Sequence, residues 1–155
     1  MAPGVVARHG VTVVVMAAGG IVTVAGSLMP WLRAGRRLRH SYDLFALAPR
    51  LGFTPDGLAA RGLRWWPLVP LLTVAAVVMA WWGGRRAGGV LGVVAALYAG
   101  GIALAVATAD TRGVVDLQTG PVVTAVGAAV LLGGSVATTL VVSPPGCRPP
   151  TRPAR

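Results

Sequence analysis

The residues of this chain that could carry out chemistry are few, and their spacing gives little support for an active site. His40 and Asp43 lie three positions apart, a spacing that on a helix would bring an imidazole and a carboxylate together as a general-base pair. Asp110 and Asp116 lie six positions apart in a polar segment, and that spacing specifies no paired-carboxylate site. We therefore interpret His40 as an exposed imidazole beside a carboxylate, and we expect no catalytic site.

Patterns for nucleophiles, metals and phosphates are also missing from the sequence. The serines, Ser27, Ser41, Ser135 and Ser143, do not occur in a G-x-S-x-G setting. One cysteine, Cys147, and two separated histidines cannot supply the ligands of a usual zinc site. The chain has no lysine, so none of its glycine pairs belongs to a phosphate-binding G-K-[ST] loop. The sequence predicts a protein that is not an enzyme and needs no cofactor or metal.

The composition is typical of a membrane protein rather than of a soluble domain. Hydrophobic residues make up 55% of the chain and charged residues 12%, whereas soluble domains carry about 25% charged residues. This apolar content excludes intrinsic disorder for most of the chain, and the single cysteine excludes a disulfide-rich scaffold. The net charge of +10 comes from arginines, but no soluble basic module is present in which they would bind nucleic acid.

Four long apolar segments account for about half of the chain and contain no charged residue. A membrane-spanning helix needs about 20 mostly apolar residues, and the segments cover residues 11–29, 66–82, 90–108 and 121–142. They predict an all-α polytopic membrane protein with four transmembrane helices in an antiparallel bundle. Residues 1–142 would form this single domain, and the Pro- and Arg-rich residues 143–155 would form a disordered tail.

The first connection, residues 30–65, carries seven arginines and is bracketed by tryptophans that would lie at headgroup level. Ser41 and Thr54 are typical helix starts, so we expect short surface helices in this loop. The loop would lie on the membrane and bind anionic lipid headgroups, unless its arginines only anchor the ends of the spans. The candidate lipid-binding residues are Arg33, Arg36, Arg37, Arg39, Arg50, Arg61, Arg64, Trp31, Trp65 and Trp66.

The segment that ends the first span resembles a known group of proteins. Residues 28–37, LMPWLRAGRR, followed by residues 41–44, SYDL, are similar to the first loop of uncharacterised small four-span membrane proteins of high-GC bacteria. The resemblance implies the bacterial cell (inner) membrane and an extracytoplasmic first loop, so that both termini are cytoplasmic. The arginine count opposes this orientation, because eight arginines would then lie outside and six inside. We favour cytoplasmic termini.

Small residues recur every four positions in the predicted spans, a spacing that permits close helix packing in lipid. Two such ridges occur in the third span and one in the fourth. They consist of Gly88, Gly92, Ala96 and Gly100, of Ala95, Ala99 and Ala103, and of Ala125, Ala129 and Gly133. The first span carries Gly19, Thr23 and Ser27. We expect packing within the bundle, with contact to a membrane-protein partner or a second copy through the third helix as the alternative.

These observations leave three hypotheses about function. The first is a non-enzymatic integral membrane protein that serves as an accessory, assembly or scaffold component of a cell-envelope complex. The second is a membrane protein that binds anionic lipid through the arginine-rich first loop. The third, an enzyme acting on a lipid-linked substrate, depends on His40 and Asp43 alone.

Overall fold

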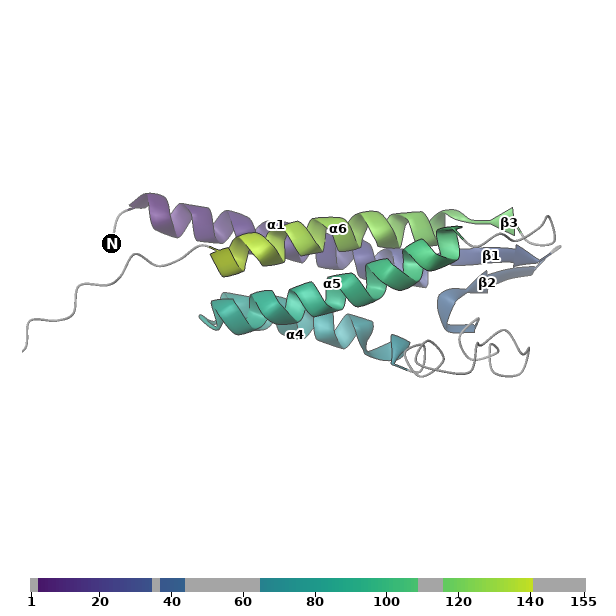
Figure 1. Cartoon of the computed structure of the whole chain (residues 1–155), viewed down its shortest axis with the longest axis horizontal. Helices are drawn as coiled ribbons and strands as arrows, with labels where there is room; N and C mark the ends of the chain where they lie inside the picture. Colours follow the sequence, from purple (N-terminus) through teal and green to yellow (C-terminus); the bar gives the residue numbers. More distant parts are fainter. Residues whose placement is uncertain (1–2, 35–36, 44–64, 109–115, 141–155) are drawn as a thin grey trace, which may run out of the picture.

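The structure is a computed structural model that describes residues 3–34, 37–43, 65–108 and 116–140. It is mostly helical, as predicted, and its long helices lie side by side (Figure 1). They are α1, Pro3–Leu28; α4, Val69–Trp81; α5, Arg85–Thr108; and α6, Thr119–Leu140. Three of the described helices, over Gly10–Leu28, Arg85–Thr108 and Thr119–Leu140, are long and apolar enough to cross a membrane, and the apolar stretch Trp66–Trp81 is shorter.

The helices differ at their ends from the predicted spans. α1 begins at Pro3, and the 3-10 helix η2, Trp66–Leu68, precedes α4 because prolines without a backbone donor are tolerated only in a first turn. α5 begins at Arg85, so Arg85 and Arg86 belong to its first turn and not to a loop. The predicted tail, 143–155, and the greater part of the first loop, 44–64, lie outside the described residues.

A tight turn joins α4 to α5 and explains the early start of α5. The Gly84 N–H donates to Met79 O over 2.9 Å, which closes the last turn of α4. Gly83 has φ +98°, a left-handed backbone that glycine adopts without steric cost. The Gly84 carbonyl then accepts the first helical bond of α5, from Gly88 N–H over 2.7 Å. Residues 82–84 are therefore sufficient to reverse the chain.

The two ends of the helical body differ in character. At one end α1 begins, α4 turns into α5 and α6 finishes, and we call this the turn end (Figure 1). At the other end α1 and α5 finish and α6 begins beside short strands, and we call this the sheet end. α6 packs against both α1 and α5, while α4 packs against α5 and α1. The described chain therefore starts and finishes at the same end of the body.

The segment after α1 is a β-hairpin, which corrects the all-α prediction for this loop. Strand β1, Pro30–Ala34, pairs antiparallel with β2, Arg37–His40, and with β3, Asp116–Leu117, in the order β2-β1-β3. A two-residue connection that contains glycine, here residues 35–36, is a hairpin signal that the sequence already carries. Residues 41–43 are helical, and the helix expected from Thr54 lies outside the described residues.

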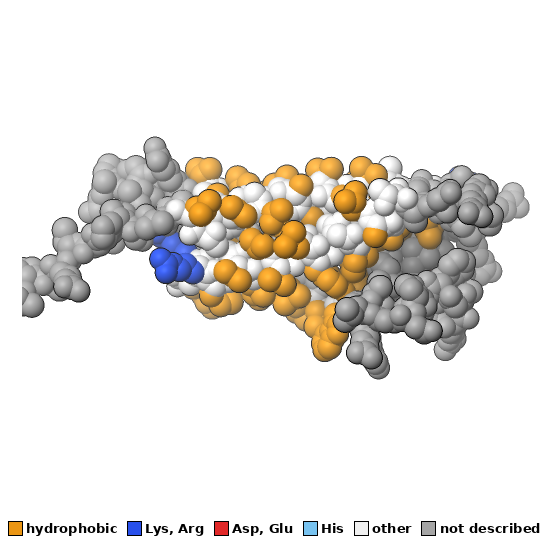
Figure 2. All heavy atoms as spheres, in the orientation of Figure 1, with side chains coloured by type: hydrophobic (Ala, Val, Ile, Leu, Met, Phe, Trp, Pro, Cys, Tyr) orange, Lys and Arg blue, Asp and Glu red, His pale blue; other side chains and the backbone are white. Residues whose placement is uncertain are grey.

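Small and hydroxyl residues fill the interior of the helical body, and large aliphatic residues cover its exterior. Glycines bring backbones into contact: a Cβ on Gly19 would lie 2.3 Å from the backbone nitrogen of Leu131 in α6. Figure 2 shows hydrophobic side chains along the length of the body, and the exposed ones include Val14, Ile21, Leu71, Val94, Leu97, Val126 and Leu140. This distribution is the reverse of that in a soluble bundle, and it suits a lipid surrounding rather than water.

Buried threonine hydroxyl groups are satisfied by the backbone of their own helix. Thr23, Thr73 and Thr124 each donate to the carbonyl four residues earlier, over 2.8, 2.8 and 2.9 Å. Thr138 does the same over 2.7 Å, whereas the buried Ser135 Oγ has no hydrogen-bond partner among the described atoms. Local bonding of this kind lets threonine serve as a compact packing residue without a polar partner on a neighbouring helix.

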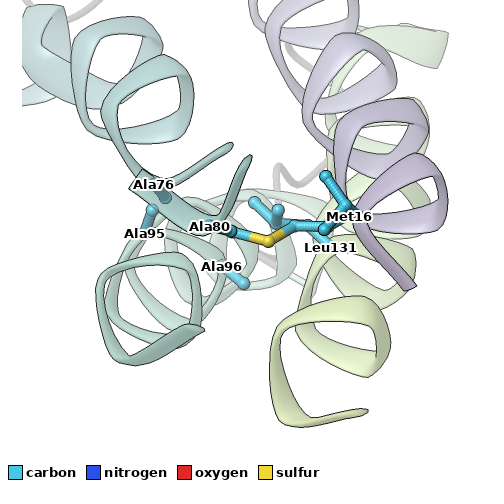
Figure 3. Packing of buried hydrophobic residues seen from close by; sticks show 7 residues of the cluster. Met16, Ala76, Ala80, Ala95, Ala96 and Leu131 are labelled. Carbon is cyan, nitrogen blue, oxygen red and sulfur yellow. The ribbon is translucent and has the colours of Figure 1, made fainter. Parts of the chain in front are cut away.

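Met16 of α1 is the large flexible side chain in a core made mainly of alanines. It extends from α1 toward Ala80 of α4 and Ala96 of α5, with Leu131 of α6 beside it (Figure 3). Its methyl carbon would lie 2.7 Å from a Cβ on Gly92, so the absence of a side chain there makes room for the thioether. Met16 therefore contacts the packing surfaces of the other helices and fills the space that small residues leave.

Candidate functional site

Side chains from the hairpin and from the residue that follows it close the C-terminal end of α1. The last carbonyls of a helix have no partner within the helix and need donors from elsewhere. Trp31 donates its Nε1–H to Gly26 O over 3.0 Å, and Ser41 donates its hydroxyl to Ser27 O. Because both acceptors are buried, these bonds remove a desolvation cost that the open helix end would otherwise carry.

A β-bulge directs Trp31 into the helical body. The β1–β2 register shifts at Trp31, since Pro30 and Leu32 pair with consecutive residues of β2. The Trp31 side chain is fully buried. A Cβ on Gly120 would lie 2.5 Å from Trp31 Cδ1, so glycine near the start of α6 is what leaves room for the indole.

Trp66 completes a buried cluster of rings and hydroxyls. Its ring meets that of Trp31 edge to face, with centroids 5.2 Å apart and planes at 79°, and that of Tyr98 at 6.2 Å. Its Nε1–H donates to Ser41 Oγ over 3.1 Å. The Ser41 hydroxyl therefore accepts a hydrogen bond from Trp66 Nε1–H and donates its own hydrogen to Ser27 O. We call Trp31, Ser41, Trp66 and Tyr98 the aromatic cap.

His40 and Asp43 border the aromatic cap but are not placed as a catalytic pair. His40 Nδ1 lies 2.9 Å from Leu28 O, and because a carbonyl can only accept, this nitrogen must carry the hydrogen. Both side chains are exposed, and the described residues include no ion pair between them. The described residues also include no group of three His, Cys, Asp or Glu that could hold a metal ion. The geometry is that of a helix cap.

The structure separates the residues predicted to bind lipid. Trp31 and Trp66 are fully buried with their N–H groups bonded inside the protein, so their rings are not exposed to contact a lipid headgroup. Trp65 is 62% exposed, and Arg33 is exposed on β1, opposite Asp116 in the strand register. Of the remaining arginines, Arg37 and Arg39 belong to β2, and Arg36, Arg50, Arg61 and Arg64 lie outside the described residues.

The predicted ridges of α5 lie at helix contacts. Gly88, Gly92, Ala95, Ala96, Ala99 and Ala103 are buried, and Gly100 is half-buried. A Cβ on Gly88 would meet the Ala80 backbone nitrogen of α4 at 2.5 Å, and one on Gly100 would meet Ala128 Cβ of α6 at 3.1 Å. Gly88 and Gly100 belong to the same predicted ridge, and this ridge therefore contacts two different helices of the chain.

The predicted ridge of α6 is displaced from the packing face. Ala129 and Gly133 are exposed and Ala125 is half-buried. The buried residues are Gly120, Pro121, Thr124, Gly127, Ala128, Leu131, Gly134, Ser135 and Thr138. A strict spacing of four rotates around a helix, whereas alternating steps of four and three, as in 120, 124, 127, 131, 134 and 138, stay on one face. That alternation is visible in the sequence, and it is the signal that a search for strict fourfold spacing misses.

Ser41 is the residue of the aromatic cap whose role sequence reasoning did not find. Its sequence context predicts a helix N-cap, but its hydroxyl bonds to Ser27, 14 positions earlier, and to Trp66, 25 positions later. Local spacing carries no information on contacts of that range.

Comparisons with models of protein families, with curated proteins and with solved structures find no match to this chain.

Proposed function

We propose that this chain is a multi-pass protein of the bacterial cell membrane that serves, without catalysis, as an accessory, assembly or scaffold component of an envelope complex. In this proposal α1, η2 with α4, α5 and α6 each cross the bilayer, as an antiparallel bundle. The observation that carries it is the reversed distribution of residues, with Gly, Ala and Thr inside and Val, Leu and Ile outside. In water, the large apolar side chains on the outside of this body would remain exposed and would gain no hydrophobic stabilisation. The close backbone packing of its interior is the kind that holds helices together in lipid.

The shorter fourth helix fits this proposal. Trp66–Trp81 would be roughly 25 Å long at the usual rises of 3-10 and α-helices, against a hydrocarbon thickness of about 27–30 Å. Trp65 before it and Trp82 after it are 62% and 84% exposed. Indole rings at both ends of an apolar helix favour the headgroup level of the two leaflets.

Small exposed residues on the outside of α5 and of α6 support a partner protein. Gly133 of α6 is exposed with no described atom within 4 Å of a built Cβ, and the same holds for Gly101 of α5. Ala129, four positions before Gly133, and Ala105, four positions after Gly101, are also exposed. Glycine and alanine on a lipid-facing surface allow another helix to approach closely. The hypothesis of lipid binding by the first loop is weakened because Trp31 and Trp66 are buried. The enzyme hypothesis is weakened because His40 bonds to Leu28 O and forms no described ion pair with Asp43.

Cysteine labelling tests the number of crossings. We expect Cys147, which follows α6 in the sequence, to react with a membrane-impermeant maleimide only after spheroplasts are lysed, because α6 ends at the turn end. The variant Cys147→Ser/Asp43→Cys carries its thiol at an exposed position of the sheet end, so it should react in intact spheroplasts. Reaction of both positions on the same side would contradict four crossings. The reverse pattern would keep the bundle and place the termini outside.

Mild detergent extraction of native membranes tests the accessory role. We expect the wild-type chain to comigrate with a larger membrane protein, and Gly133→Leu to lose comigration because leucine fills the surface that a partner helix would approach. The matched control is Val126→Leu, a change of one methylene group on another exposed position of α6. Migration of the wild type alone, or unchanged comigration of Gly133→Leu, would contradict the proposal.

A further inference from the structure

We propose that the turn end binds anionic phospholipid headgroups through Trp81, Trp82, Arg85 and Arg86, which we call the tip patch. This inference rests on the membrane-spanning part of the proposed function. It assigns a lipid site at the end of the body opposite to the arginine-rich first loop. The occupant is the phosphate-bearing headgroup of lipids in the adjacent leaflet.

The α4–α5 turn fixes the positions of the tip patch residues. Gly83, with φ +98°, and the bond from Gly84 N–H to Met79 O hold the chain in one compact reversal. Trp81 and Trp82 end α4 and are 66% and 84% exposed, and Arg86 is exposed in the first turn of α5. Two indole rings and two guanidinium groups therefore lie within six consecutive residues on a short, folded turn.

A third arginine lies at the same height on another helix. The Met16 methyl group borders Gly92, so these two residues mark one level of the body. At about 1.5 Å per residue, Arg8 of α1 lies about 12 Å from that level and Arg85 about 10 Å, both toward the turn end. The fold thus gathers at one end arginines that are far apart in the sequence.

The charges of the tip patch have no counter-charge among the described residues. Arg85 and Arg86 occupy the first turn of α5, where the helix dipole is positive and disfavours a cation. The acidic residues of the described part, Asp43 and Asp116, belong to the sheet end. Figure 2 shows the guanidinium groups in blue at the turn end, with no acidic side chain beside them in the coloured part of this face. A bound anion would offset both the mutual repulsion and the dipole.

The surroundings of the tip patch identify that anion as a lipid headgroup. The exposed side chains directly behind it, Val78, Met79 and Val90, are apolar and belong to the lipid-facing surface. Indole rings prefer the boundary between acyl chains and headgroups, and arginine beside them reaches the phosphate layer. The tip patch therefore places indoles and guanidinium groups together where the apolar surface ends, at the level where a leaflet presents its interface and its phosphates.

Reconstitution in vesicles tests the site. The full chain is placed in phosphatidylcholine vesicles, and the relative association of spin-labelled phosphatidylglycerol and phosphatidylcholine is measured at low and high salt. We expect the wild type to associate with phosphatidylglycerol more strongly than with phosphatidylcholine. In Arg85→Gln/Arg86→Gln the ratio of the two associations should fall by at least about fivefold, since each arginine near the surface contributes about fivefold. Salt should weaken the wild-type preference.

Two controls separate this site from a general charge effect. Arg85→Lys/Arg86→Lys keeps the charge and should keep the preference, and Arg33→Gln removes an exposed charge at the sheet end and should leave most of it. Equal association of the two lipids with the wild type, or an unchanged preference in Arg85→Gln/Arg86→Gln, would overturn the inference. Carbonate extraction in parallel distinguishes the failures: a chain that resists extraction but shows no preference overturns the tip patch alone, whereas an extractable chain also overturns the membrane-spanning proposal.

Discussion

Replacement of Gly127 by leucine is expected to separate α1 from α6 and to lower the free energy of unfolding by about 3 kcal/mol or more. Even a Cβ at this position would lie 2.4 Å from the backbone nitrogen of Thr23. A backbone cannot move aside as the end of a side chain can, so α1 would have to shift as a unit. Unfolding of the purified chain in mixed micelles, by titration with sodium dodecyl sulfate and detection of tryptophan fluorescence, measures the change.

The matched control for this variant is Gly133→Leu, the same substitution six positions later in the same helix. A Cβ on Gly133 meets no described atom within 4 Å, and leucine is a better helix former than glycine. We expect Gly133→Leu to unfold at the wild-type concentration of sodium dodecyl sulfate or above it. Equal stability of the two variants would show that α1 and α6 do not pack through Gly127.

Removal of the Trp66 side chain is expected to cost about 3–5 kcal/mol of stability, as is usual for a large aromatic residue taken from a packed interior. The indole is fully buried between Trp31 and Tyr98, and its N–H donates to Ser41 Oγ. Trp66→Ala would leave a cavity and weaken the cap of α1. Hydrogen exchange followed by mass spectrometry should show faster exchange in the last turn of α1 and in β1.

Trp65 provides the neighbouring control, because it is 62% exposed. Trp65→Ala should leave both the unfolding midpoint and the exchange of the last turn of α1 close to the wild type. Trp66→Phe keeps a ring but removes the donor to Ser41, so it should fall between the wild type and Trp66→Ala. A Trp65→Ala variant as unstable as Trp66→Ala would contradict the distinction between an interior and a surface tryptophan at this corner.

The long helices were predictable because their signal is local. An apolar run such as residues 121–142 can satisfy its backbone in lipid only as a helix, whatever the rest of the chain does. The ends were less predictable, since Arg85 could belong to a loop or to a first turn. The bond from Gly84 N–H to Met79 O and the φ of Gly83 decide that point.

The face of each helix that packs against a neighbour was not predictable from the fourfold spacing of small residues alone. In α6 that spacing selects Ala129 and Gly133, which are exposed, while the packed face carries Gly127 and Gly134. Small residues occur all around this helix, so composition does not choose a face. The choice is made by α1, whose Gly19 and Thr23 fit against α6 at backbone distance.

The sequence by itself determined that this chain forms long apolar helices with small residues for close packing, because hydrophobicity and backbone bonding act within each segment. Only the tertiary structure decided that Trp31 and Trp66 turn inward, that Ser41 joins them to the end of α1, and that Arg8 shares one end of the body with Arg85. The physical reason is that these arrangements depend on contacts between residues distant in the chain. Such contacts form only when the helices have packed and the β-bulge has set the direction of the indole.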